Sequence, residues 1–95
     1  MSTEKKVQKD IIEYLTKKGI LHYRQNSGSK GYIKFCSING ISDIVCIHQG
    51  RYVGIEVKDV KGKQSKDQIL FEKNLNNAGG LYILAKSLKD VITKL

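Results

Sequence analysis

Two charged residues, Glu56 and Lys58, alternate with apolar ones in the segment GRYVGIEVKD. Successive side chains of a β-strand point to opposite faces, so Val53, Ile55 and Val57 would share one face and the charged pair the other. Such a pair can be an ordinary feature of an exposed face. It can also serve hydrolysis, in which a carboxylate holds a cation and an ammonium stabilises developing negative charge. The residue opposite Glu56 decides between these interpretations.

The preceding segment SDIVCIH (42–48) supplies a second carboxylate if the two segments form a hairpin. With Gln49-Gly50 as a two-residue loop, Asp43 lies directly opposite Glu56 on the same face, with Cβ atoms roughly 5 Å apart. Like charges so placed destabilise a sheet, and a divalent cation between them reverses the sign. Glutamine is not a preferred residue at the first position of this turn, and a bulge or longer loop would shift the register by one.

Two further residues lie near this pair by their spacing. Gly54, two residues before Glu56, is expected to leave open space beside the acids. Glu4 lies three residues before Val7 and therefore on the inward stripe of a first helix, from which it can reach over the end of the sheet. An acid in the first helical turn is also favourable simply because of the helix dipole.

Gln68 has two interpretations of its own. In Ser65-Lys66-Asp67-Gln68 it can complete a capping box by bonding back to the start of its helix. Alternatively, its amide points toward Lys58 or a bound phosphate, because the connection between them is short. The sequence leaves both open.

Periodicity and turn residues predict the elements that position these groups. We expect helices over 3–18, 66–78 and 87–95, and strands over 20–25, 32–38, 42–48, 51–59 and 81–85. The apolar residues expected to face inward from the helices are Val7, Ile11, Tyr14, Leu15, Ile69, Leu70, Leu75, Leu88, Val91, Ile92 and Leu95. Ser87 and Asp90 resemble a capping box at the last helix. The order predicts an α/β fold, a single compact domain over 1–95 with helices flanking a central mixed sheet.

The chain is strongly basic. Seventeen Lys and Arg against nine Asp and Glu give a net charge of +8, and the lysines are spread along the whole chain. A surplus of this size favours a polyanionic partner, most often nucleic acid. A merely lysine-rich, soluble surface is the other interpretation.

No segment indicates export or a membrane. No stretch approaches the roughly 20 apolar residues of a membrane span, and MSTEKKVQKD lacks the apolar segment of a signal peptide. We therefore expect a cytoplasmic protein of a phage or prokaryotic host. Cys36 and Cys46 lie in apolar runs and are expected to be buried thiols. His22 and His48 have no second His or Cys at ligand spacing, which argues against zinc.

Three motifs carry a family resemblance. GISDIVCI (40–47), IEVK (55–58) and KGKQSKDQ (61–68), followed by AGGLYILAKSLKDV, resemble the VRR-NUC family of the PD-(D/E)XK nuclease superfamily over nearly the whole chain. Asp43, Glu56 and Lys58 stand at the motif positions of the superfamily. Ser42 departs from the pattern, since a proline often precedes the Asp. The resemblance implies a restriction-endonuclease-like α-β-β-β-α-β core.

The resemblance also implies an activity: metal-dependent, structure-specific DNA endonuclease, as in stand-alone Holliday junction resolvases that act as homodimers in recombination and repair. A nicking or flap nuclease and a non-catalytic DNA-binding domain are the alternatives. Hard oxygen ligands suit Mg²⁺, with Mn²⁺ as a substitute. The implied catalytic residues are Glu4, Asp43, Glu56, Lys58 and Gln68, and the implied metal ligands are Asp43, Glu56, the main-chain carbonyl of Val57 and, through water, Glu4.

Lys58 would stabilise the transition state, orient the attacking water or help to deprotonate it; these roles stay open. Phosphate contacts are expected from polar residues in loops and at helix starts, where binding would weaken steeply with salt. These residues are Lys5, Lys6, Arg24, Asn26, Ser27, Lys30, Lys61, Lys63 and Lys66.

Overall fold

The computed structural model describes residues 3–25 and 40–95. The expected strand over 32–38 lies outside them, as do Asn26, Ser27, Lys30 and Cys36. The described residues form, in order, α1 (Glu4–Lys17), β1 (Leu21–Arg24), β2 (Ile44–His48), β3 (Arg51–Val57), α2 (Lys66–Asn77), β4 (Leu81–Ala85) and α3 (Leu88–Lys94). The predicted helices and strands in these ranges are confirmed, with ends that differ by up to two residues.

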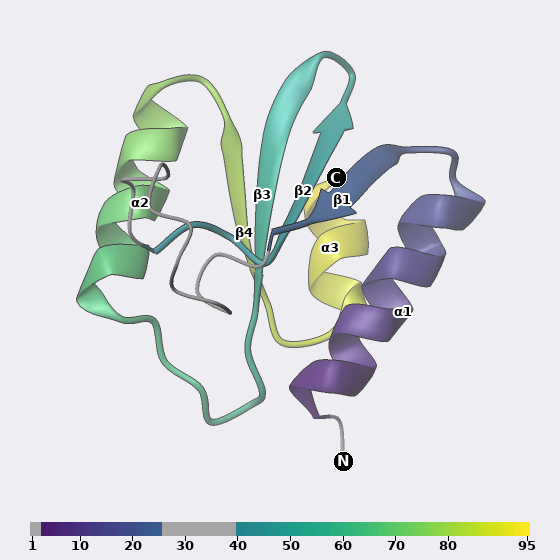
Figure 1. Ribbon diagram of the computed structural model, residues 1–95, viewed down its shortest axis with the longest axis horizontal. Helices are drawn as coiled ribbons and strands as arrows, with labels where there is room; N and C mark the ends of the chain where they lie inside the picture. Colours follow the sequence, from purple (N-terminus) through teal and green to yellow (C-terminus); the bar gives the residue numbers. More distant parts are fainter. Residues whose placement is uncertain (1–2, 26–39) are drawn as a thin grey trace, which may run out of the picture.

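The strands form a mixed sheet in the order β1-β2-β3-β4. β1, β2 and β3 pair antiparallel, whereas β4 runs parallel to β3 after the crossover through α2. Figure 1 shows α1 and α3 together on one side of this sheet and α2 on the other. The described residues therefore make one compact α/β domain, which confirms the predicted class.

The hairpin between β2 and β3 has the predicted loop and register. Gln49 and Gly50 both have positive φ angles, 53° and 77°, as a type I′ turn requires. Ile44 pairs with Ile55 at the far end of the ladder. Gln49 thus takes a backbone conformation that non-glycine residues rarely adopt, and the register places Asp43, immediately before β2, beside the end of β3.

The core lies between the sheet and the α1/α3 layer. Val7, Ile11 and Leu15 of α1 pack against apolar side chains of β2, β3 and β4, and Val91 of α3 joins them. Cys46 is buried in this core, and burial raises the pKa of its thiol to about 11, so it stays protonated at neutral pH. The expected burial of this cysteine is confirmed.

The expected inward face of α2 was wrong in part. Ile69 and Leu70 are 53% and 56% exposed. The stripe that faces the sheet is instead Gln68, Phe71 and Leu75, at the i, i+3, i+7 spacing of one helix face. Gln68 reaches β3, and Phe71 packs edge-on against Tyr82 of β4. Leu75 lies against Gly54 of β3 and against Gly80, which precedes β4. One polar residue, Gln68, thus lies on the face that packs against the sheet, and the apolar pair Ile69 and Leu70 lies outside it.

Two expectations for α3 were also wrong. Ile92 is 48% exposed, because the residues that pack against the core, Leu88, Val91 and Leu95, leave it off the inner stripe. Ser87 makes no side-chain cap; instead, Asp90 accepts a 2.8 Å hydrogen bond from the main-chain N–H of Lys86. Within the described ranges, no helix is long and apolar enough to cross a membrane.

Candidate functional site

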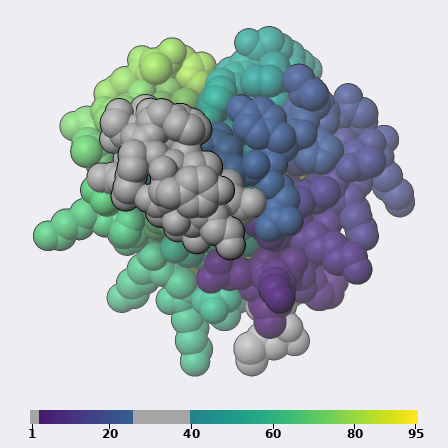
Figure 2. Space-filling view, in the orientation of Figure 1, coloured from purple at the N-terminus to yellow at the C-terminus, as the bar shows by residue number. Residues whose placement is uncertain are grey.

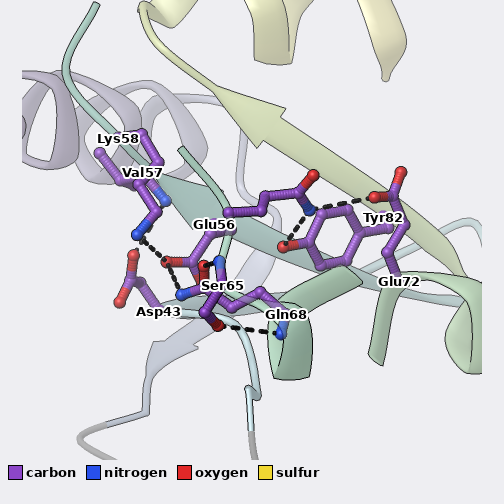
Figure 3. Close-up of polar contacts among 9 residues, drawn as sticks. Asp43, Glu56, Val57, Lys58, Ser65, Gln68, Glu72 and Tyr82 are labelled. Carbon is purple, nitrogen blue, oxygen red and sulfur yellow. Dashed lines mark hydrogen bonds and ion pairs between the residues drawn. The ribbon is translucent and has the colours of Figure 1, made fainter. Parts of the chain in front are cut away.

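Asp43 and Glu56 meet at the end of the β2–β3 hairpin, on the side of the sheet that faces α2 (Figure 3). The Oδ2 atom of Asp43 accepts a 2.9 Å hydrogen bond from the main-chain N–H of Val57. This bond fixes the Asp43 carboxylate against the last residue of β3. The hairpin thus brings the two acids together, as its register predicted.

Glu56 is buried, with only 3% of its surface exposed. Its Oε2 atom accepts a 2.9 Å hydrogen bond from Nε2 of Gln68 and lies 3.8 Å from Nζ of Lys58. Its Oε1 atom is also buried and has no hydrogen-bond partner among the described residues. A buried carboxylate oxygen without a partner is costly, so such atoms call for an explanation.

The surroundings of Glu56 raise its pKa to about 8. Burial is the largest cause, because it disfavours the charged form, and the negative charge of Asp43 is the second. The ammonium of Lys58 acts in the opposite direction and offsets part of this rise, whereas the Asp43 carboxylate, which can share a proton with Glu56, and the charge of Glu4 add to it. Glu56 without further positive charge is therefore largely protonated at neutral pH.

Lys58 shares the face of Glu56, as strand alternation predicted. Its side chain is mostly buried, and its main-chain N–H bonds to the carbonyl of Ala85 on β4. The ammonium lies 3.8 Å from Oε2 of Glu56, which is a loose ion pair. It favours the charged form of Glu56 and so offsets part of the rise in the pKa of that residue.

Gln68 closes the capping box, which is the first of the two interpretations that the sequence left open. Its Oε1 atom accepts a 2.8 Å hydrogen bond from the main-chain N–H of Ser65, and the Ser65 hydroxyl accepts one from the N–H of Gln68, which completes the capping box. The same side chain donates through Nε2 to Glu56. The amide thus points to the carboxylate rather than to Lys58.

Glu4 is less closely engaged. It opens α1, after Thr3 as the N-cap, and its side chain is exposed. It lies near enough to Glu56 to raise the pKa of that residue. Its position at the helix start is compatible with an outer role in the site and equally with stabilisation of the helix dipole.

The expected space beside Gly54 is filled. A side chain at this position would collide with the hydroxyl of Ser42 and come within 3.1 Å of Leu75. Ser42 is itself buried, and its hydroxyl has no hydrogen-bond partner in the described part of the chain. Gly54 therefore permits close packing of Ser42 and α2 instead of leaving a hollow for a ligand.

The residues expected to contact phosphate are exposed where the structure describes them. Figure 2 shows the segment between β3 and α2 and the start of α1 along one edge of the molecule. Lys6 makes a 3.1 Å ion pair with Asp10, and this pair competes with a contact between Lys6 and phosphate. The described members of this set are Lys5, Lys6, Arg24, Lys61, Lys63 and Lys66.

A neighbouring polar cluster was missed by sequence reasoning. The amide of Gln64 donates 3.0 Å and 3.2 Å hydrogen bonds to Glu72 and to the hydroxyl of Tyr82 (Figure 3). This ties the loop before α2 to both the helix and β4. The spacing of Gln64 and Glu72 gives only a weak signal, since the contact depends on β4 lying beneath them.

The acids can serve as part of a cation site. Within residues 3–25 and 40–95, no three His, Cys, Asp or Glu side chains form a ligand group. A cation at this pair would therefore take further ligands from the main chain or from water, as Mg²⁺ commonly does. No protein-family model and no curated protein matches this chain. Function must therefore be inferred from the geometry and chemistry of the site.

Proposed function

We propose that the chain is a metal-dependent DNA endonuclease that hydrolyses phosphodiester bonds. One observation carries the proposal: the buried carboxyl group of Glu56 lies beside a second one, Asp43, and its Oε1 atom has no hydrogen-bond partner among the described residues. A buried carboxylate in a folded protein normally accepts hydrogen bonds from neighbouring donors. A site for a divalent cation accounts for both the missing partner and the paired charges.

The residues fit a hard divalent cation such as Mg²⁺ or Mn²⁺. Asp43 and Glu56 offer carboxylate oxygens, and the main-chain carbonyl of Val57 is the third ligand implied by the family resemblance. Glu4 would contribute through water. When bound, such a cation activates a water molecule and offsets charge on the scissile phosphate.

The chain's own residues supply the remaining functions. Lys58 holds a positive charge beside Glu56, where it stabilises negative charge that develops on the phosphate. Gln68 fixes the orientation of the Glu56 carboxylate through its amide. The main-chain N–H of Val57 donates to Oδ2 of Asp43 and thereby fixes this carboxylate beside Glu56.

DNA is the proposed substrate. The net charge of +8 and the exposed lysines of the described residues favour a polyanion. The resemblance to the VRR-NUC family supports a restriction-endonuclease-like topology and a four-way junction as the preferred DNA form. A homodimer would then provide the two sites that symmetric cleavage needs.

The test is cleavage of end-labelled four-way junction, flap and linear duplex, with and without Mg²⁺. We expect paired cuts in the junction only with the metal, and none by Glu56→Ala, which should still bind DNA. Cuts in the flap or single nicks would assign the other nuclease classes. Binding without any cleavage would contradict catalysis and favour a DNA-binding domain, and full activity of Glu56→Ala would show that the site is wrongly assigned.

A further inference from the structure

The segment 40–43 leads into Asp43 and touches the first turn of α2. Gly40 has a φ of +76°. A Cβ atom on it would collide with the main-chain carbonyl group of Asp67 and lie 2.7 Å from the main-chain nitrogen of Gln68. These contacts are with backbone atoms, which cannot rotate away as a flexible side chain can. Only glycine therefore allows this approach to the helix.

The other end of the segment is fixed to β3. The hydroxyl of Ser42 occupies the position beside Gly54 where a side chain would be, and Asp43 accepts the hydrogen bond from Val57. Four consecutive residues thus contact α2 at one end and β3 at the other. Their packing sets the distance between the first turn of α2 and the strand.

That distance decides whether Gln68 reaches Glu56. The hydrogen bond from Nε2 to Oε2 is 2.9 Å, and such bonds weaken rapidly as they lengthen beyond about 3.2 Å. The other end of the amide is committed to the Ser65 N–H in the capping box, so the side chain has little freedom to follow a displaced acid. A shift of the helix start by several tenths of an ångström would weaken the bond.

We infer that Gly40 is a positioning residue: by lacking a side chain, it holds the first turn of α2 at the distance from which Gln68 orients Glu56. Its importance for metal binding and cleavage rests on the proposed function, whereas the positioning of Gln68 does not. Gly40 is not among the residues proposed to bind the metal or the substrate. It acts through the backbone of Asp67 and Gln68.

The first measurement uses the unchanged protein. Nuclear Overhauser contacts are expected between the Hα protons of Gly40 and the amide proton of Gln68, because the two residues are in backbone contact. Their absence in well-resolved spectra would overturn the inference without any variant. This arm stays decisive if substitutions at Gly40 prevent folding.

The second measurement compares Gly40→Ala with Gly19→Ala. Gly19 has a similar φ of +69°, but a Cβ there meets nothing within 4 Å, so this control has similar backbone strain without the collision. We expect Gly40→Ala to shift the side-chain amide resonances of Gln68 and to weaken Mn²⁺ binding roughly ten- to a hundredfold, as loss of an outer partner of a metal ligand does. Gly19→Ala should change neither.

Unchanged Gln68 resonances in folded Gly40→Ala would overturn the inference. Shifted resonances in a protein that binds no Mn²⁺ and cuts no DNA would uphold the positioning and reject the proposed function. In a Gln68→Ala background, Gly40→Ala should have no further effect on Mn²⁺ affinity. If Gly40→Ala weakens Mn²⁺ binding in the Gln68→Ala background as much as it does in the unchanged protein, Gly40 does not act through Gln68.

Discussion

The side-chain amide of Gln68 donates a 2.9 Å hydrogen bond to the buried carboxylate of Glu56. Because the same amide also closes the capping box of α2, the start of the helix and the acid of β3 are joined by one side chain. Local helix stability and the geometry of the site are therefore coupled. This relationship allows the two contributions to be separated by substitution.

Substitutions at Gln68 should separate the cap from the site. Gln68→Glu keeps an acceptor for the Ser65 N–H, since glutamate is a usual capping-box residue, but it places a second carboxylate against Glu56. We expect the helix cap to persist and the pKa of Glu56 to rise further, with loss of Mg²⁺-dependent cleavage. Gln68→Ala should destabilise the fold by about 1–2 kcal/mol through loss of both hydrogen bonds. Carboxyl NMR titration and chemical denaturation measure the two effects, and a Gln68→Glu variant with normal cleavage would contradict this role.

The pH dependence of stability should reflect Glu56. Its pKa is about 8 in the folded protein against an ordinary value of 4.5, so between these values the folded state binds more protons than the unfolded state. In the absence of metal, the contribution of Glu56 to the free energy of unfolding should therefore fall as the pH rises from about 4.5 to about 8. Urea denaturation at several pH values tests this. Glu56→Gln, which stays neutral, should show a flatter profile, and identical profiles would refute the assigned shift.

Much of the arrangement was predictable from the sequence because it depends on local rules. The Gln49-Gly50 turn set the register, and strand alternation placed Lys58 on the face of Glu56. The contacts around Gly40 and Gly54 depend on segments far apart in the chain, for which local patterns carry no signal. For that reason Gly54 was expected to border open space, although Ser42 fills it.

The docking of α2 shows the same limit. Periodicity identified the helix but assigned Ile69 and Leu70 to its inner face, because they are the most apolar adjacent residues in it. Both are exposed in the structure. The face that meets the sheet includes Gln68, whose partner Glu56 is visible only once α2 is packed. The contact of Gln68 with Glu56 therefore follows from the tertiary packing of α2 and not from the local pattern.

Divalent cations should stabilise the fold. A ligand that binds the folded state alone raises the free energy of unfolding, by about 2.7 kcal/mol at a concentration one hundred times its dissociation constant. We expect Mn²⁺ or Mg²⁺ at pH 8 to raise the Tm of the unchanged protein, and to leave that of Asp43→Asn and Glu56→Gln unaffected. Differential scanning calorimetry with each cation, and with Ca²⁺ as a third, measures these changes in Tm. Equal stabilisation of all three proteins would place cation binding elsewhere.

Lys58 should contribute to rate more than to binding. Its ammonium lies 3.8 Å from Glu56, whereas Lys61 is exposed on the following loop. Removing one stabilising donor at a reacting centre typically slows the reaction 10²–10³-fold. We expect a loss of about this size in single-turnover cleavage for Lys58→Met at saturating protein. The matched variant Lys61→Met should weaken DNA binding and its salt dependence while leaving the saturated rate nearly unchanged; the reverse pattern would argue against the role of Lys58.

Anomalous diffraction from crystals grown or soaked with Mn²⁺ would test the central claim most directly, because it locates the cation itself. We predict an anomalous peak between the carboxylates of Asp43 and Glu56, at distances of about 2.0–2.3 Å from their oxygens. The peak should be absent in Glu56→Gln crystals under the same conditions. A fully occupied Mn²⁺ site elsewhere, with no peak between these two acids, would contradict the account.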